Sequence, residues 1–124
     1  PPPLITKTVL VVDDNADSRE LPAPVLSTAG SAVREAHNGE EAIEFLPRTS
    51  NRKPSMVFLD LMMPVMDGRT FLERLRKLHR LVTLPVVVVS ASLSGAIEGA
   101  RRLVSKPASP DVLRQLAREY CGPP

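Results

Sequence analysis

Two apolar segments of the chain run directly into carboxylates. Residues 9–12 (Val-Leu-Val-Val) are followed by Asp13 and Asp14, and residues 56–59 (Met-Val-Phe-Leu) are followed by Asp60. A short apolar run bounded by turn residues is typical of a strand buried in a parallel sheet. An aspartate after one such strand is, taken alone, an ordinary turn or capping residue. Aspartates in the same position after two strands indicate instead that these acids act together at one edge of a sheet.

The remaining pattern predicts an alternation of strands and helices. Further strands are expected at Ser31 to Ala36, at Val86 to Ser90 and at Leu103 to Lys106. Apolar residues at helical spacing predict the intervening helices, which we place at 16–29, 40–46, 69–79, around 94–100 and 110–120. Five strands alternating with five helices predict one α/β domain, with a parallel sheet covered on both faces and right-handed crossovers.

Two of these helices carry local signals against regular geometry. Pro22 and Pro24 lie inside the first helix, where each removes a backbone donor and clashes with the preceding turn, so we expect a kink or partial unwinding there. Only residues 91–102 separate the fourth strand from the fifth, which is about the minimum for a parallel crossover. The fourth helix is therefore expected to be one or two turns at most.

Length and composition exclude several classes of protein. A length of 124 residues suits one domain, and 16 Lys and Arg against 14 Asp and Glu give no strongly basic surface for nucleic acid. Cys121 is the single cysteine, so an internal disulfide is excluded, and no apolar run approaches a membrane span. We expect a soluble, cytoplasmic protein. The proline-rich residues 1–3 and 123–124 are interpreted as linker ends, possible remnants of a larger parent chain.

Four strand ends bring chemically useful side chains to one edge of the predicted sheet. These are Asp13 with Asp14, Asp60, Ser90 and Lys106. Three adjacent carboxylates would repel one another unless a cation joined them, and hard oxygen ligands suit Mg²⁺. A lysine and a hydroxyl beside them suit an anion with several oxygens, such as a phosphoryl group. A carboxylate can itself accept that group, and Asp60 on the central strand is the candidate.

These residues resemble the signatures of the receiver domains of two-component response regulators. The motifs are residues 9–15 (VLVVDDN), residues 59–68 (LDLMMPVMDG), Ser90-Ala91 and Lys106-Pro107, in the family's order and over nearly the whole chain. The resemblance implies a flavodoxin-like, doubly wound sheet of strand order 2-1-3-4-5. It also implies a receiver domain at residues 8–121, an N-terminal linker at 1–7 and a tail at 122–124.

The resemblance implies a role for each motif residue. Asp60 would be the phospho-acceptor, and Asp14, Asp60 and the Met62 carbonyl would bind Mg²⁺, with Asp13 acting through water. Ser90 would be the switch hydroxyl, and Lys106 would contact the phosphoryl group, with a cis peptide before Pro107. The implied partners are a histidine kinase or phosphotransfer protein and an unidentified output partner, without direct nucleic-acid or membrane binding, in a monomer or weak dimer. The domain would assist its own phosphorylation without being an enzyme.

Three departures from the family keep an alternative open. The crossover from Ser90 to Lys106 is about six residues shorter than usual, Leu103 replaces the usual aromatic residue, and prolines interrupt the first helix. A pseudo-receiver that binds partners with weak or no phosphorylation switching is therefore the second hypothesis. A phosphatase using an aspartyl-phosphate fits less well, because its acids would be two residues apart and a cap domain does not fit within these 124 residues. A flavin-binding flavodoxin is disfavoured by the acidic first loop.

Overall fold

The computed structural model describes residues 7–15, 31–46, 54–61, 68–77, 84–91 and 97–121. Five parallel strands form one sheet in the order β2-β1-β3-β4-β5. The strands are β1 (Lys7–Val12), β2 (Ser31–Ala36), β3 (Met56–Leu59), β4 (Val86–Ser90) and β5 (Arg102–Ser105). The predicted flavodoxin-like order 2-1-3-4-5 is confirmed.

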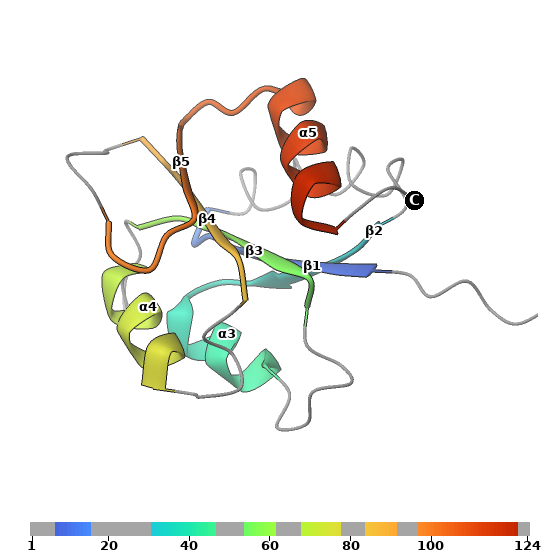
Figure 1. The fold of residues 1–124 in the computed structure, drawn as a ribbon. Helices are drawn as coiled ribbons and strands as arrows, with labels where there is room; N and C mark the ends of the chain where they lie inside the picture. Colours follow the sequence, from blue (N-terminus) through green and yellow to red (C-terminus); the bar gives the residue numbers. More distant parts are fainter. Residues whose placement is uncertain are drawn as a thin grey trace, which may run out of the picture.

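Helices cover both faces of this sheet (Figure 1). In the described part of the chain, these helices are α3 (Gly39–Phe45) and α4 (Gly68–Lys77) on one face and α5 (Pro110–Cys121) on the other. Strand alternation explains the two layers: Leu10 and Val57 face α3 and α4, whereas Val11 and Phe58 face α5. Both apolar layers are buried, so the central strands are the nearly continuous apolar runs that a covered parallel sheet requires.

Local capping sets where two of the helices begin. The Asn38 side chain accepts a hydrogen bond from the Glu41 backbone N–H at 2.8 Å, which caps α3. The Ser109 hydroxyl oxygen accepts from the Val112 N–H at 3.2 Å, and Pro110 occupies the first helical position of α5. The last helix thus begins at residue 110, as the sequence predicted.

The crossover between β4 and β5 differs from expectation in its described part. Residues 97–100 form a turn, in which the Ala100 N–H donates to the Ile97 carbonyl at 3.1 Å and Gly99 has φ of +93°. A left-handed residue ends a helix, so the expected short helix does not continue through residue 100. The expected first helix, with Pro22 and Pro24, lies outside the described residues. Among the described helices, none has the length and apolar character to cross a membrane.

Candidate functional site at the carboxyl edge of the sheet

Backbone hydrogen bonds fix the strand ends that carry the predicted site residues. The Asp60 N–H donates to the Val12 carbonyl at 2.9 Å, and the Asp13 N–H donates to the Ala36 carbonyl at 3.1 Å. The Lys106 N–H donates to the Ser90 carbonyl at 3.0 Å. Each bond continues a strand ladder by one residue. The backbone at the start of each site segment is therefore held by the sheet.

Three carboxylates converge at this edge, as the sequence predicted. One carboxylate oxygen from each of Asp13, Asp14 and Asp60 lies within 4.8 Å of the others. Asp13 is 5% exposed and Asp60 is 7% exposed, whereas Asp14 is exposed to solvent. The Asn15 backbone N–H donates to Asp13 Oδ1 at 2.9 Å. Two largely buried carboxylates and one open carboxylate thus share a small volume.

Lys106 reaches this cluster from the loop after β5. Its Nζ lies 2.7 Å from Asp13 Oδ2 and 3.7 Å from Asp60 Oδ2. The sequence placed Lys106 at the site, but its close pairing with Asp13 instead of Asp60 is visible only in the structure. The Lys106–Pro107 peptide is cis, as the resemblance implied.

The charge and the donor atoms of the cluster fit a divalent metal ion. Three carboxylates against one ammonium leave a formal excess of two negative charges when all are ionised. Carboxylate oxygens are hard ligands, and the exposed Asp14 leaves room for the water molecules that Mg²⁺ retains. The donor set therefore suits Mg²⁺. Met62, whose carbonyl the resemblance adds to the ligand set, lies outside the described residues.

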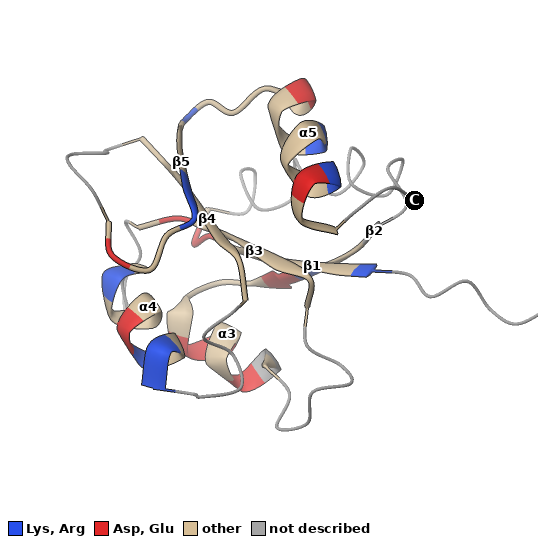
Figure 2. Cartoon of the chain, in the orientation of Figure 1, with Lys and Arg blue, Asp and Glu red and all other residues tan. Residues whose placement is uncertain are grey.

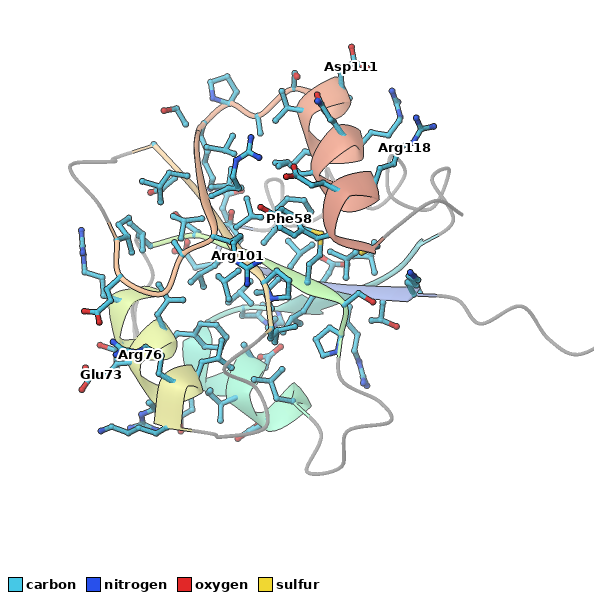
Figure 3. All side chains as sticks on the ribbon, in the orientation of Figure 1. Phe58, Glu73, Arg76, Arg101, Asp111 and Arg118 are labelled. Atoms are coloured by element: carbon cyan, nitrogen blue, oxygen red, sulfur yellow. The ribbon has the colours of Figure 1, made fainter. Side chains whose placement is uncertain are left out.

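The space beside the three carboxylates is large enough to admit a further chemical group. A cavity of about 390 Å³ is lined by Asp13, Asp60 and Lys106 together with apolar side chains that include Phe58 and Leu113. Figure 3 shows Phe58 between the sheet and α5. Ser90, at the end of β4, is fully buried and does not line this cavity. The structure thus brings Asp13, Asp14, Asp60 and Lys106 together, whereas Ser90 is a buried residue at the end of the neighbouring strand β4.

Gly68 is a neighbour of the site that the sequence indicated only as the last residue of the motif at residues 59–68. Its N–H donates to the Leu61 carbonyl at 3.0 Å. A Cβ at this position would lie 2.8 Å from Leu61 Cα and 2.9 Å from the Asp60 carbonyl oxygen. The helix α4 therefore starts in direct contact with the backbone that carries Asp60. The available signal was a glycine at a first helical position, where a better helix former is usual.

Comparisons with known proteins agree with this geometry. The model of the response regulator receiver domain matches residues 9–118. A 14.6 kDa protein of Leptolyngbya boryana is 33% identical over 91% of this chain and 88% of its own length. The phosphate regulon transcriptional regulatory protein PhoB of Pseudomonas aeruginosa is 33% identical over 86% of this chain, and the sensor histidine kinase CheAY of Helicobacter pylori is 29% identical over 89%.

The chain spans 48% of the length of PhoB and 14% of the length of CheAY. Among solved structures, that of a putative response regulator from Chloroflexus aurantiacus has a TM-score of 0.80 and 30% identity. The alignment covers 93% of this chain and 97% of that one.

Proposed function

Because the chain belongs to the response regulator receiver domain family of two-component signal transduction, we propose that residues 8–121 accept a phosphoryl group on Asp60. The proposal rests on one observation. The side chains of Asp13, Asp14, Asp60 and Lys106 lie close together at the carboxyl edge of a doubly wound sheet. That edge is where open parallel sheets place their ligands. Asp60 is the acceptor because it ends the central strand β3 and is flanked by the other charged groups.

In the proposed transfer, a carboxylate oxygen of Asp60 attacks the phosphorus of a phosphohistidine on a kinase or phosphotransfer protein. The P–N bond breaks, the P–O bond forms, and the released imidazole takes a proton from solvent. Asp13, Asp14 and Asp60, with the Met62 carbonyl, would hold Mg²⁺. When bound, the ion would offset the charge that the phosphoryl oxygens bring to the acids.

Two further residues act on the phosphoryl group in this proposal. Lys106 lies 3.7 Å from Asp60 Oδ2, so its ammonium is within a short movement of an oxygen on the new phosphoryl group. The Ser90 hydroxyl would turn toward the same group. The domain assists this transfer and the later hydrolysis of the acyl phosphate, and it signals through protein contacts. A cytoplasmic location, absence of direct nucleic-acid or membrane binding, and a monomeric or weakly dimeric state belong to the same proposal.

Phosphorylation with a small phosphodonor tests this function. Incubation with Mg²⁺ and an acyl phosphate should give an acid-stable, base-labile adduct on the wild-type protein, detected by a gel shift and by intact mass. Asp60→Asn should abolish the adduct. Asp111→Asn is the matched control, because Asp111 is an exposed aspartate on α5 that is distant in sequence from the acid cluster. A wild-type protein that acquires no adduct would refute the proposal.

A pseudo-receiver remains the second candidate, and one observation favours it. Leu103 is 40% exposed on β5, and it lacks the aromatic ring with which the usual residue would respond to the site. Amide spectra with Mg²⁺ and beryllofluoride distinguish the two candidates. Changes confined to residues beside Asp60 favour the pseudo-receiver, whereas changes that extend along a helix favour a switching domain.

A further inference from the structure

The helix α4 contacts two other segments of the chain. One is the backbone of Asp60 and Leu61, directly after β3, and the other is the crossover that follows β4 and Ser90. At its first residue, Gly68 packs against the backbone of Asp60 and Leu61, with no room for a Cβ. Toward its last turn, Arg76 forms an ion pair of 2.8 Å with Glu98 in the crossover that follows β4. A displacement at the end of either strand would therefore shift the position of α4.

Apolar packing reinforces the contact between α4 and the crossover turn. Ile97 is 6% exposed and belongs to the same buried cluster as Leu72 and Leu75 of α4. Gly99, in its left-handed conformation, lies against Leu72, whose Cδ2 would be 3.5 Å from a Cβ at residue 99. The turn at residues 97–100 thus packs directly against part of the α4 surface.

A cleft of about 400 Å³ lies where α4 meets this turn. Its lining consists of Arg69, Glu73, Arg76, Ile97 and Glu98. Figure 3 shows Glu73 and Arg76 together on the outer side of α4, away from the sheet. One side of the cleft is α4, which packs on the backbone of Asp60, and the other is the turn at residues 97–100, which follows Ser90 along the chain. The shape of the cleft therefore depends on the position of α4 relative to this turn.

The exposed surface of α4 is basic. Arg69, Arg74, Arg76 and Lys77 are exposed there, with Glu73 as the single acid of the helix (Figure 2). Lys77 Nζ lies 3.8 Å from Glu73 Oε1, and Arg76 is paired with Glu98. Within the described part of the chain, no ion pair involves Arg69 or Arg74. Two guanidinium groups are therefore available to an acidic partner.

We propose that this cleft, with the flanking exposed surface of α4, is an output surface that binds an acidic segment of a partner protein according to the state of Asp60. The inference rests on the proposed function and adds the surface and the partner chemistry to it. Carboxylates of the partner would pair with Arg69 and Arg74. Glu73 and Glu98 within the cleft oppose the continuous negative charge of a nucleic-acid backbone, so a peptide with spaced acids fits better.

Amide chemical shifts test the coupling between the site and the cleft. Addition of Mg²⁺ and beryllofluoride to the wild-type protein should shift amides near Asp60 and also those of residues 68–77 and 97–100. Shifts near Asp60 without shifts in α4 or the turn would overturn this inference and leave the phosphorylation proposal standing. A spectrum with no response anywhere would count against both, and the adduct assay with Asp60→Asn then judges the proposed function by itself.

A charge-reversal pair tests the partner chemistry. A fluorescent peptide in which glutamates alternate with serines serves as the probe, and its anisotropy is measured in Mg²⁺ with and without beryllofluoride. Arg69→Glu should weaken binding by about fivefold, as expected for losing and reversing one exposed charge contact. Arg118→Glu is the control, because Arg118 is an exposed arginine on α5 and the change in net charge is identical. Its affinity should stay within about twofold of wild type.

Three results of the binding assay would overturn the inference. Equal losses in both variants would mean that the peptide responds only to net charge. An affinity that is the same with and without beryllofluoride would remove the dependence on Asp60. Tighter binding of a single-stranded oligonucleotide than of the peptide, lost in Arg69→Glu, would assign the surface to nucleic acid instead.

Discussion

Gly68→Ala is the substitution for which the structure gives the sharpest expectation. The new Cβ would lie 2.8 Å from both Leu61 Cα and Leu61 Cδ2 and 2.9 Å from the Asp60 carbonyl oxygen. Side-chain Cδ2 can rotate away, but the two backbone atoms belong to the turn that carries Asp60. To restore ordinary contact, the start of α4 must retreat from that turn by roughly half an ångström.

Two effects of opposite sign determine the free energy of unfolding of this variant. Alanine is a better helix former than glycine, by about 0.8–1.0 kcal/mol in a helix interior and by less at a first position. Overpacking against backbone costs about 1–3 kcal/mol. The steric term is the larger, so the net loss should be about 1–2 kcal/mol. For a domain of this size, that corresponds to a melting temperature lower by roughly 4–8 °C.

Urea unfolding followed by far-ultraviolet circular dichroism measures this loss, since the chain has no tryptophan. The midpoint should fall with an unchanged dependence on denaturant. Gly99→Ala is the control: its Cβ would have ordinary contacts of 3.5 Å or more, but φ of +93° makes it unstable for conformational reasons. Only Gly68→Ala should also reduce adduct formation on Asp60. A Gly68→Ala protein as stable as wild type would refute the reasoning.

Three further variants test other contacts. Lys106→Met removes the ammonium at 2.7 Å from Asp13 Oδ2. Because this positive charge opposes a cation at the carboxylates, Mg²⁺ should bind about fivefold more tightly to the variant, as measured by titration calorimetry. Weaker binding would contradict this account of the charges. Asn38→Ala removes the cap that accepts from the Glu41 N–H, so the protein should lose about 1 kcal/mol of stability in urea, and an unchanged midpoint would show that the cap is dispensable. Burial raises the pKa of the Cys121 thiol above its ordinary value of 9.0, so the folded state holds that proton more tightly than the unfolded state does. The stability that this proton contributes is complete below about pH 9 and is lost as the pH rises from there through the raised pKa, so Cys121→Ala should lose less stability than wild type as the pH rises above about 9.

Local patterns were sufficient to predict the sheet and the polar ends of its strands. The β2 and β4 bounds match the prediction, and β1 begins at Lys7, two residues before the apolar run of residues 9–12. The agreement is physical, because a parallel strand covered on both faces needs a continuous apolar run and little else. The end of each run then fixes which residue lies at the carboxyl edge. The convergence of Asp13, Asp14 and Asp60 therefore follows from strand boundaries alone.

Contacts between elements were not predictable in the same way. The sequence places Lys106 at the edge, but whether its ammonium lies beside Asp13 or Asp60 depends on the path of the loop after β5. The packing of Gly68 on the Asp60 turn depends on the angle at which α4 leaves the sheet. The turn at residues 97–100 lies where the sequence predicted part of a short helix, because Gly99 has φ of +93°, which is outside helical geometry, and the chain must return to β5.

The positions of Leu103 and Ile97 indicate where a change at Ser90 would be transmitted. The β4–β5 register pairs Val88 with Leu103, so Leu103 lies on the face of the sheet that α4 covers. It is 40% exposed there, however, whereas Ile97 is 6% exposed against α4. A displaced side chain transmits force only through atoms in close contact, and an exposed leucine has few of them. A movement of the chain after Ser90 should therefore pass through Ile97 into α4 before it alters β5.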